Sequence, residues 1–529
     1  MLLESQEKNK YFYDPKAKST QWCHPVLYFI IKLHYRGMDV EQWFGELTDE
    51  PVPIDDYGPT AKPEIAYYFQ KYKMLRDNGF FAPQDTPENE HFLSGRLTPG
   101  RIKASLANTR QLSLEVVDYC NLECAYCTYG KFYTNYDRRE KNQLSIGTAK
   151  NLLNYLLDLL NSPLNQSHDQ IFYIGFYGGE PLLNFSFIRE MTAYVRQVKA
   201  VHNRFRFNMT TNGLLLEKYM DFLVEHDFDL LISLDGNEYN SSYRVFKGGK
   251  PAYTEIVRNI DALRSKYPDY FKEKVNFNAV IHNRNSMNDL YHYFKTQFNK
   301  VPSISELNPS GIAASMREEF RKTYANITTS LFQVEDYSMV EKDMFINLPN
   351  IRGVNSFIQQ CSGFVFNDYN ELIAAGDKAR GTKEDSPPAA KGASPPKAPK
   401  ETVHIPTGTC IPFSRKVFVT VKGKILPCER IGFQYGLGSA DENTVNLDFE
   451  EIAHTYNSYF DRLKKQCCSC ANSEACLQCI FYLNWDQTHP QCRGFLNEDE
   501  FSRFLSTQLS YLEKNPQTYL KILEEVRFA

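Results

Sequence analysis

Short apolar runs alternate with longer amphipathic stretches through the middle of this chain, from about residue 111 to residue 311. The short runs are rich in β-branched and aromatic residues, and the segments between them repeat apolar residues at helical spacing, as in LSIGTAKNLLNYLLDLL. Strands that alternate with helices in this way are typical of parallel βα units. The pattern predicts six strands, at residues 112–117, 171–177, 204–210, 230–235, 275–281 and 303–308.

Six βα units are too few for a closed (βα)8 barrel, so the predicted fold class is α/β with a partial, TIM-like (βα)6 barrel. In parallel βα folds, ligand sites gather at the carboxyl ends of the strands. Four segments rich in polar residues or glycine fall at those ends, around Cys120, Gly178, Asn212 and Asp235. Their shared location predicts one site.

Two further regions flank the predicted barrel. Residues 1–105 contain the stretches HPVLYFIIKLHY and EIAYYFQKYKMLRDNGF, which predict a separate and mostly helical unit. On the other side, segment 376–401 is rich in Pro, Ala and Lys, which favours a flexible linker. The expected domains are an N-terminal unit at 1–105, the barrel at 106–350, a connecting segment at 351–405 and a cysteine-rich domain with a C-terminal helix at 406–529.

Composition narrows the functional classes. The chain has 529 residues and a net charge of −4, so a nucleic-acid partner is not expected, and its apolar runs are too short to span a membrane. The N-terminal sequence MLLESQEKNKYFYDPK lacks the apolar core of an export signal, which favours a cytoplasmic protein. In a reducing compartment, 13 cysteines that fall mainly into two clusters indicate metal binding rather than disulfides.

The first cysteine cluster is CNLECAYC, which places Cys120, Cys124 and Cys127 at the spacing C-x3-C-x2-C. A structural zinc site uses four protein ligands, whereas three thiolates leave one metal position open for another ligand. With Tyr126 as its aromatic residue, this motif resembles that of the radical S-adenosylmethionine (SAM) superfamily. The resemblance implies a 4Fe-4S cluster whose open iron binds SAM and reduces it to a 5'-deoxyadenosyl radical.

Other strand ends fit the same resemblance. The segment GGEP consists of Gly178, Gly179, Glu180 and Pro181 and matches a motif of the superfamily. The resemblance implies that the glycines allow close backbone approach and that the glutamate accepts a hydrogen bond from the SAM ammonium. Alone, GGEP would also fit an ordinary strand-to-helix turn. The segments TTNG and ISLDG supply Asn212, Ser233 and Asp235 as further SAM-binding positions. Arg244 corresponds to the arginine expected at the SAM carboxylate, although the family's usual spacing from DG to that arginine is one residue longer than the spacing here.

The C-terminal cysteines resemble the SPASM extension of radical SAM enzymes, although Cys476 and Cys479 are separated by two residues where the family more often has three. The resemblance implies two auxiliary 4Fe-4S clusters. Auxiliary cluster I would take Cys410, Cys428 and Cys479, and auxiliary cluster II would take Cys467, Cys470, Cys476 and Cys492. One ligand of cluster I stays open, and it could be Cys361, Cys468, a non-cysteine residue or the substrate. The alternative for this region is a pair of zinc knuckles.

Glu429 directly follows Cys428 in the segment PCER. Anaerobic sulfatase-maturating enzymes carry a proton-accepting aspartate at this position, so Glu429 is a candidate catalytic base. The alternative is a solvated or salt-bridged glutamate, paired for example with Arg430.

SPASM enzymes modify peptides and proteins, so the resemblance implies a peptide substrate. Residues 1–105 resemble, more weakly, the small winged-helix element with which peptide maturases capture a leader peptide as an added strand. A helical cap that only packs on the barrel is the alternative. The expected partners are a ribosomally synthesised precursor peptide with a leader and a flavodoxin or ferredoxin reductant, and the expected cofactors are SAM and three 4Fe-4S clusters.

The expected function is that of a peptide maturase. Its 5'-deoxyadenosyl radical would abstract hydrogen from a peptide residue, which would then close a thioether or a carbon-carbon or ether cross-link. The alternatives within enzymes are a peptide epimerase and a sulfatase-type maturase that oxidises Cys or Ser to formylglycine. The alternative outside enzymes is a peptide-binding or electron-transfer iron-sulfur protein.

Overall fold

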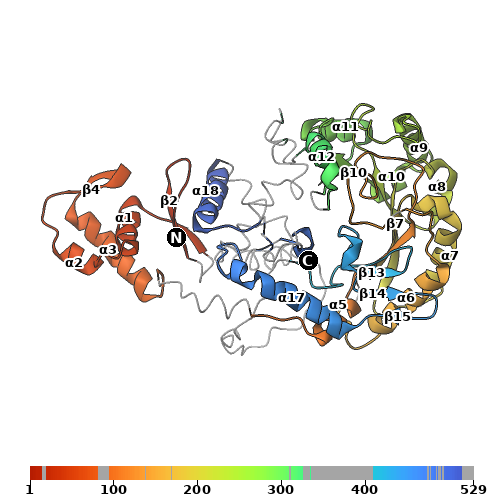
Figure 1. The fold of residues 1–529 in the computed structure, drawn as a ribbon. Coiled ribbons are helices and arrows are strands. Elements are labelled where there is room, and N and C mark those ends of the chain that lie inside the picture. The colour runs from red at the N-terminus through yellow and green to blue at the C-terminus, as the bar shows by residue number, and fades with distance from the viewer. Residues whose placement is uncertain are drawn as a thin grey trace, which may run out of the picture.

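The computed structural model describes residues 1–14, 19–81, 94–308 without 138, 168 and 169, then 311–325, 330, 334, 405 and 409–514 without 474, 475, 477, 484, 486–489, 491 and 493. The N-terminal unit lies at one end of the molecule and the barrel at the other, with helices α17 (Phe449–Cys468) and α18 (Glu498–Lys514) between them (Figure 1). The predicted linker at 376–401 and Cys361 lie outside the described residues.

Six parallel strands form the barrel sheet and pair in chain order. They are β6 (Gln111–Val117), β7 (Ile171–Gly178), β8 (Arg204–Thr211), β9 (Asp229–Ser233), β10 (Val275–Ile281) and β11 (Ser303–Glu306). The six predicted strands are confirmed, with ends that differ by no more than two residues.

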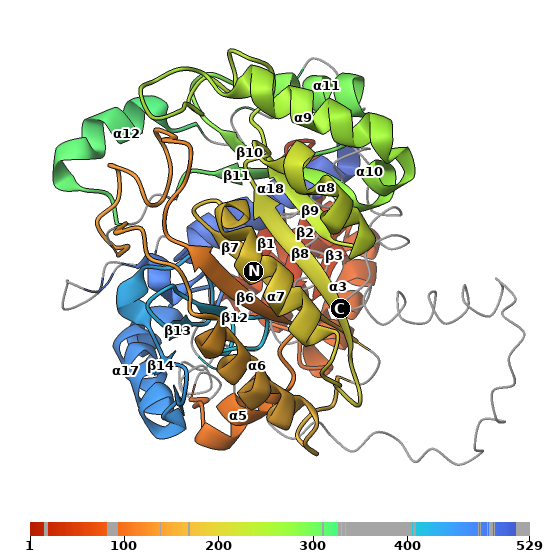
Figure 2. The ribbon, with the colours of Figure 1, turned by 90° about the vertical axis from the view of Figure 1, so that its right-hand side faces the viewer.

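Helices cover the outer face of this sheet, as Figure 2 shows for those that cross in front of the strands. They include α6 (Ile146–Leu160), α7 (Phe185–Val195), α8 (Leu216–Glu225), α9 (Tyr253–Lys266), α10 (Pro268–Lys274) and α11 (Met287–Phe298). Helix α11 shows how the sequence sets helix ends. The Ser286 side chain accepts a hydrogen bond from Asp289 N at its start, and Asn299 ends it in the left-handed conformation with φ of 51°.

The two faces of the barrel strands differ in polarity because successive side chains alternate in direction. In β6, Leu112, Leu114 and Val116 are fully buried in the main hydrophobic core. The alternate residues Gln111 and Ser113 instead line a cavity inside the barrel. The barrel therefore has an apolar outer layer and a polar interior.

The C-terminal segment extends the barrel sheet. Strand β12 (Val417–Val419) pairs in parallel with β6, and β13 (Lys424–Leu426), β14 (Gly438–Ala440) and β15 (Val445–Asn446) follow in antiparallel order. Barrel and C-terminal strands thus form one sheet of ten strands among the described residues. The segment predicted as a separate domain shares backbone hydrogen bonds and a core with the barrel.

The N-terminal unit contains the predicted helices and also a sheet. Helices α1 (Pro25–Tyr35), α2 (Val40–Gly45) and α3 (Lys62–Asp77) pack with an antiparallel sheet and a short hairpin, whose strands are β1 (Leu2–Glu4), β2 (Lys10–Asp14), β3 (Ser19–Trp22), β4 (Val52–Ile54) and β5 (Gly58–Thr60). The sheet was not predicted, because its strands are only three to five residues long and mix polar or charged residues with apolar ones.

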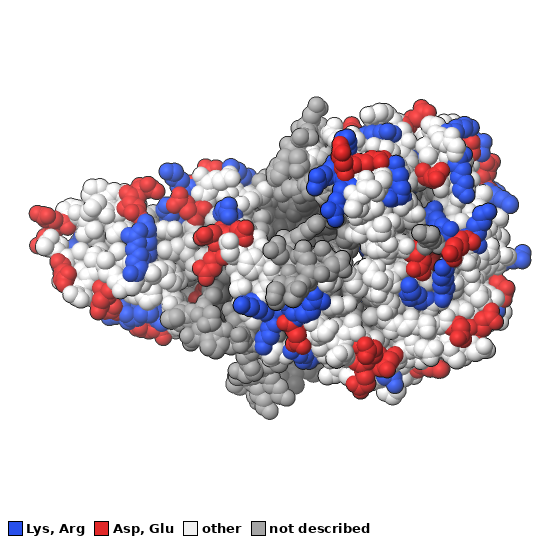
Figure 3. All heavy atoms as spheres, viewed as in Figure 1, with Lys and Arg blue, Asp and Glu red and all other residues white. Residues whose placement is uncertain are grey.

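The predicted boundary at residue 105 falls inside helix α5 (Pro99–Ala107). Ile102 and Leu106 of that helix are buried in the barrel core, so the helix packs with the barrel, and the domain boundaries stay predictions. Charges of both signs are interspersed on the described part of the face in Figure 3. No helix in the described segments is long and apolar enough to cross a bilayer.

Candidate functional site

The segment after β7 lies directly against the chain that leads into the cysteine motif. Gly179 N donates a hydrogen bond to Val117 O at 2.8 Å. A Cβ atom at Gly179 would collide with the Tyr119 carbonyl oxygen, and one at Gly178, where φ is 124°, would collide with the Val117 carbonyl oxygen. These glycines therefore allow two segments of the protein's own backbone to approach closely. This contact fixes the position of the chain just before Cys120.

Glu180 is a buried carboxylate that ties two strand ends together. Its Oε1 accepts from Thr211 Oγ1 at 2.9 Å and from Leu182 N at 3.1 Å, and its Oε2 accepts from Asn212 N at 2.7 Å. Burial raises the pKa of Glu180 to about 7, although these hydrogen bonds lower it. Since a carboxylate has about four acceptor sites, about one remains for the hydrogen bond expected from a SAM ammonium.

A buried charge network joins the aromatic residue of the cysteine motif to the ends of β9 and β10. Asp235 accepts from Arg244 Nε and Nη2, both at 2.9 Å, and from the Tyr126 hydroxyl. The His282 ring stacks on Tyr126 with 5.6 Å between ring centroids, and its Nε2 lies 3.9 Å from Asp235 Oδ2. Burial alone would raise the pKa of Asp235, but the Arg244 guanidinium outweighs it and holds the pKa well below its usual range.

This network gives Arg244 a partner that the sequence did not suggest. The ion pair with Asp235 uses two of its five N–H donors, so a SAM carboxylate would have to bind the others. His282 was missed altogether, since the histidines show no metal-ligand spacing. Its position directly after β10, at the same strand ends as Asp235, was the available signal.

The three cysteines of the motif are partly buried thiols that lie near one another. Burial raises the pKa of Cys124 to about 12, and the charges of Cys127 and Cys120 raise it further. Asn212 Nδ2 donates to Cys120 Sγ at 3.4 Å, and Arg139 Nη2 donates to Cys127 Sγ at 3.2 Å. In the part of the chain that the structure describes, no three Cys, His, Asp or Glu side chains could hold a single metal ion. Cysteine thiolates are the ligands that hold iron-sulfur clusters, and three of them would leave one iron of a 4Fe-4S cluster open.

The C-terminal cysteines fall into two groups. Burial raises the pKa of Cys467 to about 12, and the neighbouring thiols that raise it further are those of Cys476, Cys492, Cys470 and Cys468. The second group surrounds Tyr456, whose pKa is raised by burial and also by Cys479, Cys410 and Cys428. The groups match the residues predicted for auxiliary clusters II and I, with Cys468 beside the former, and their roles as ligands stay predictions.

A cavity of about 630 Å³ lies inside the barrel. The barrel strands line it with mainly polar side chains, which include Gln111, Ser113, Tyr177, Asn208, Thr210 and Asn276. The C-terminal segment adds Lys416, Glu429 and Arg430. The cavity therefore extends from the amino ends of β9 and β10, at Asp229 and Val275, to Tyr177 directly before GGEP and to Glu429 directly after Cys428.

Glu429 is held by an ion pair at the edge of this cavity. Lys416 Nζ lies 3.0 Å from its Oε1, and the Cys428 Sγ lies 3.8 Å from its Oε2. Burial alone would raise the pKa of Glu429, but Lys416 outweighs it, so the pKa is lowered. Glu429 is therefore an ionised carboxylate, and the salt bridge that the sequence suggested with Arg430 is made by Lys416 instead.

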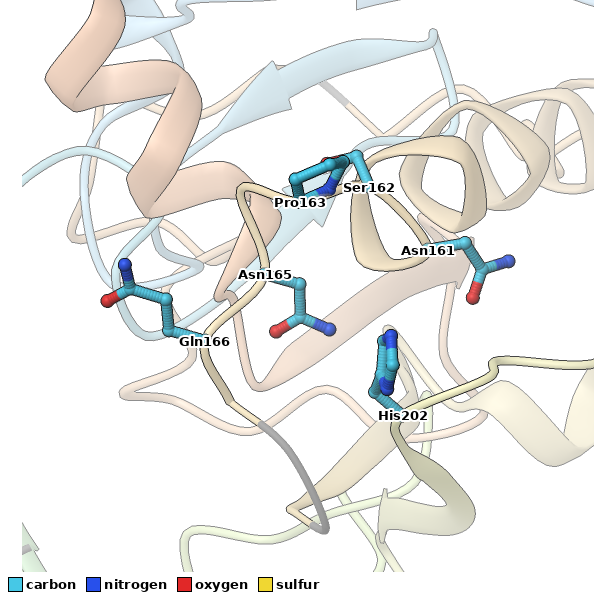
Figure 4. A pocket seen from close by; sticks show the side chains of 6 residues that line it. All are labelled: Asn161, Ser162, Pro163, Asn165, Gln166 and His202. Carbon is cyan, nitrogen blue, oxygen red and sulfur yellow. The ribbon is translucent and has the colours of Figure 1, made fainter.

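A second pocket has a volume of about 530 Å³. It is lined by the turn after α6, including Asn161 and Asn165, and by His202 before β8 (Figure 4). None of its lining residues was predicted as a site residue. Its location at the amino ends of β7 and β8 separates it from the cysteine motif.

Comparison with known proteins identifies the barrel domain. Residues 114–296 match the model of the radical SAM superfamily. The radical SAM cyclopropyl synthase TigE of Paramaledivibacter caminithermalis is 21% identical over 238 residues, which cover 44% of this chain and 47% of TigE. The serine-type anaerobic sulfatase-maturating enzyme of Bacteroides thetaiotaomicron is 30% identical over 182 residues, which cover 33% of this chain and 41% of that enzyme.

The chain thus spans less than half the length of these two curated relatives. Among solved structures, native anSMEcpe with bound AdoMet is 17% identical and aligns over 79% of this chain and 100% of that chain, with a TM-score of 0.47. The superfamily match covers the part of the chain that holds the cysteine motif and the parallel βα sheet, so residues 114–296 form a radical SAM domain.

Proposed function

We propose that this enzyme is a maturase that cross-links a ribosomally synthesised peptide. The observation that carries the proposal is the polar cavity of about 630 Å³ inside the barrel. Tyr177 lines this cavity; burial raises the pKa of Tyr177, and the charges of Glu429 and Cys127 raise it further, so this side chain lies near both cysteine regions. A peptide side chain bound beside Tyr177 and Glu429 would lie near both cysteine regions.

In this proposal, Cys120, Cys124 and Cys127 hold the 4Fe-4S cluster that binds SAM, and the bound cluster and SAM would supply the 5'-deoxyadenosyl radical. The SAM-binding positions are Tyr126, Gly178, Gly179, Glu180, Pro181, Asn212, Ser233, Asp235 and Arg244. The auxiliary clusters use the two groups of C-terminal cysteines described above. Glu429 accepts the proton that the substrate releases when the cross-link closes, which suits an ionised carboxylate at the cavity.

The N-terminal unit is proposed to bind the leader of the precursor peptide. Two exposed rings, Trp22 and Tyr67, are connected by two half-buried ones: the His24 ring lies 6.2 Å from Trp22 and stacks on Tyr68 at 4.2 Å, and Tyr68 lies 5.1 Å from Tyr67. Trp22 and Tyr67 are 60% and 58% exposed. Exposed apolar patches of this kind are typical of interaction sites, and a leader with apolar side chains would bury this one.

Iron content and SAM cleavage test the core of the proposal. Anaerobically reconstituted protein should hold about twelve irons per chain, and a Cys120→Ala, Cys124→Ala, Cys127→Ala variant should lose about four of them. The reduced wild-type protein should convert SAM to 5'-deoxyadenosine, and the variant should not. Zinc in place of iron at the C-terminal cysteines, or wild-type protein that leaves SAM intact, would contradict the proposal.

The mass of a treated precursor peptide separates the reactions. A cross-link removes two hydrogen atoms, whereas epimerisation leaves the mass unchanged. The second candidate is a sulfatase-type oxidation of Cys or Ser to formylglycine, which the location of Glu429 directly beside Cys428 favours. That reaction would introduce an aldehyde that a hydrazide reagent traps.

A further inference from the structure

Arg139 lies outside every motif of the sequence, yet its guanidinium reaches back to the cysteine motif. Its Nη2 donates to the Sγ of Cys127, twelve residues earlier in the chain, at 3.2 Å. The guanidinium carbon also lies 4.7 Å from the centre of the Tyr129 ring, a cation–π distance. The Tyr129 hydroxyl in turn donates to Glu115 Oε1 at 2.6 Å. The guanidinium is therefore held over the thiol by a side chain that is itself anchored.

The segment that carries Arg139 is fastened to the C-terminal strands on both sides. Lys422 Nζ lies 2.9 Å from Glu140 Oε2, and Lys424 Nζ lies 3.5 Å from Asp137 Oδ1. These lysines belong to the β12–β13 hairpin, which therefore contacts the residues just before and just after Arg139.

The same hairpin fixes the anchor of Tyr129. Val421 N donates to Glu115 Oε2 at 2.9 Å, so this buried carboxylate bridges the hairpin and the tyrosine. The contact of Arg139 with Cys127 thus depends on the packing of the C-terminal strands against the barrel.

A donor at a ligand sulfur has a defined effect on an iron-sulfur cluster. Reduction adds one negative charge, which hydrogen bonds to the sulfurs and nearby positive charge stabilise, so both raise the reduction potential. The effect is stronger at a partly buried site than in water. Arg139 is partly buried and supplies both the hydrogen bond and the charge.

We propose that Arg139 raises the reduction potential of the cluster held by Cys120, Cys124 and Cys127, through its hydrogen bond to the Cys127 sulfur. The inference rests on the proposed function, because it requires that cluster. The reduction transfers one electron from an external one-electron donor of the flavodoxin or ferredoxin class, and no bond at Arg139 forms or breaks. The C-terminal strands thereby help to set how readily SAM is cleaved.

A redox titration of the reconstituted full-length protein tests this, with the cluster signal followed by electron paramagnetic resonance and assigned by its change on addition of SAM. At the wild-type midpoint, Arg139→Gln should lower the ratio of reduced to oxidised cluster about tenfold, which corresponds to about 59 mV for one electron. Arg139→Lys keeps the charge but not the guanidinium geometry and should lower the ratio about threefold. The matched control is Lys131→Gln, which removes an exposed cation of the same loop that pairs with Glu319 at 2.7 Å, and it should leave the ratio unchanged.

A wild-type ratio in Arg139→Gln, or an equal drop in Lys131→Gln, would overturn the inference while the proposed function stands. If Arg139→Gln does not take up iron, Arg139→Lys decides: a lowered ratio supports the inference, and a wild-type ratio overturns it. Wild-type protein without a signal that responds to SAM would refute the proposed function, and the inference with it.

Discussion

The buried ion pair of Asp235 and Arg244 gives a sharp stability prediction. Asp235 is fully buried and Arg244 is 6% exposed, and two hydrogen bonds of 2.9 Å join them. Asp235→Asn keeps the shape of the side chain but leaves the guanidinium without a counter-charge. Removal of one partner of a buried ion pair costs about 3–5 kcal/mol of unfolding free energy. For a domain of this size, that corresponds to a fall in melting temperature of about 10 °C.

Thermal unfolding followed by circular dichroism measures this, with both proteins prepared without cofactors. The matched control is Asp229→Asn, because Asp229 also pairs with an arginine, Arg206, at 3.2 Å, but both side chains are about one-third exposed, at 29% and 31%. A partly exposed pair contributes less than about 1 kcal/mol, so this control should shift the melting temperature by only a few degrees.

Two results would refute the reasoning. The first is a loss of melting temperature in Asp235→Asn no larger than that in Asp229→Asn. The second concerns the double variant Asp235→Asn, Arg244→Met, which removes the unpaired charge and should recover part of the lost stability. If it is instead less stable than Asp235→Asn alone, the guanidinium stabilises the site by its other contacts rather than by its charge pair.

Three further predictions concern other parts of the molecule. Burial raises the pKa of Glu115 to about 7, so the contribution of this side chain to stability is present at acid pH and is lost as the pH rises through 7. In urea unfolding, the wild type should therefore lose stability relative to Glu115→Gln between pH 5 and pH 8. Unfolding free energies of the two proteins that change in parallel over this pH range would contradict the prediction. Glu429→Gln should slow formation of the modified peptide about 100-fold or more, as measured by mass spectrometry, while SAM cleavage continues. An unchanged rate of peptide modification would exclude Glu429 as the base. The double variant Trp22→Ala, Tyr67→Ala should bind the precursor peptide about tenfold more weakly, as measured by calorimetry. The control variant Tyr239→Ala, which changes a similarly exposed tyrosine on the barrel, should bind it as tightly as wild type. If the double variant also binds as tightly as wild type, the leader binds elsewhere.

The sequence alone predicted the barrel strands and the cysteine motif because both signals are local. Strands β6 to β11 are apolar runs bounded by polar segments, and the cysteines lie within eight residues of one another. The polar side chains at the ends of consecutive strands then followed from parallel βα topology, since those ends share one edge of the sheet. This is why Gly178, Asn212 and Asp235 could be assigned to one site before the structure was known.

Only the tertiary structure decided the partners of the charged groups. The sequence could not show that Glu429 pairs with Lys416 rather than with its neighbour Arg430, nor that Arg244 is committed to Asp235. The parallel pairing of β12 with β6 joins segments about 300 residues apart, and no local periodicity encodes it. Spacing along the chain determines which chemistry is available, whereas long-range packing and burial determine which groups meet and which charges are neutralised.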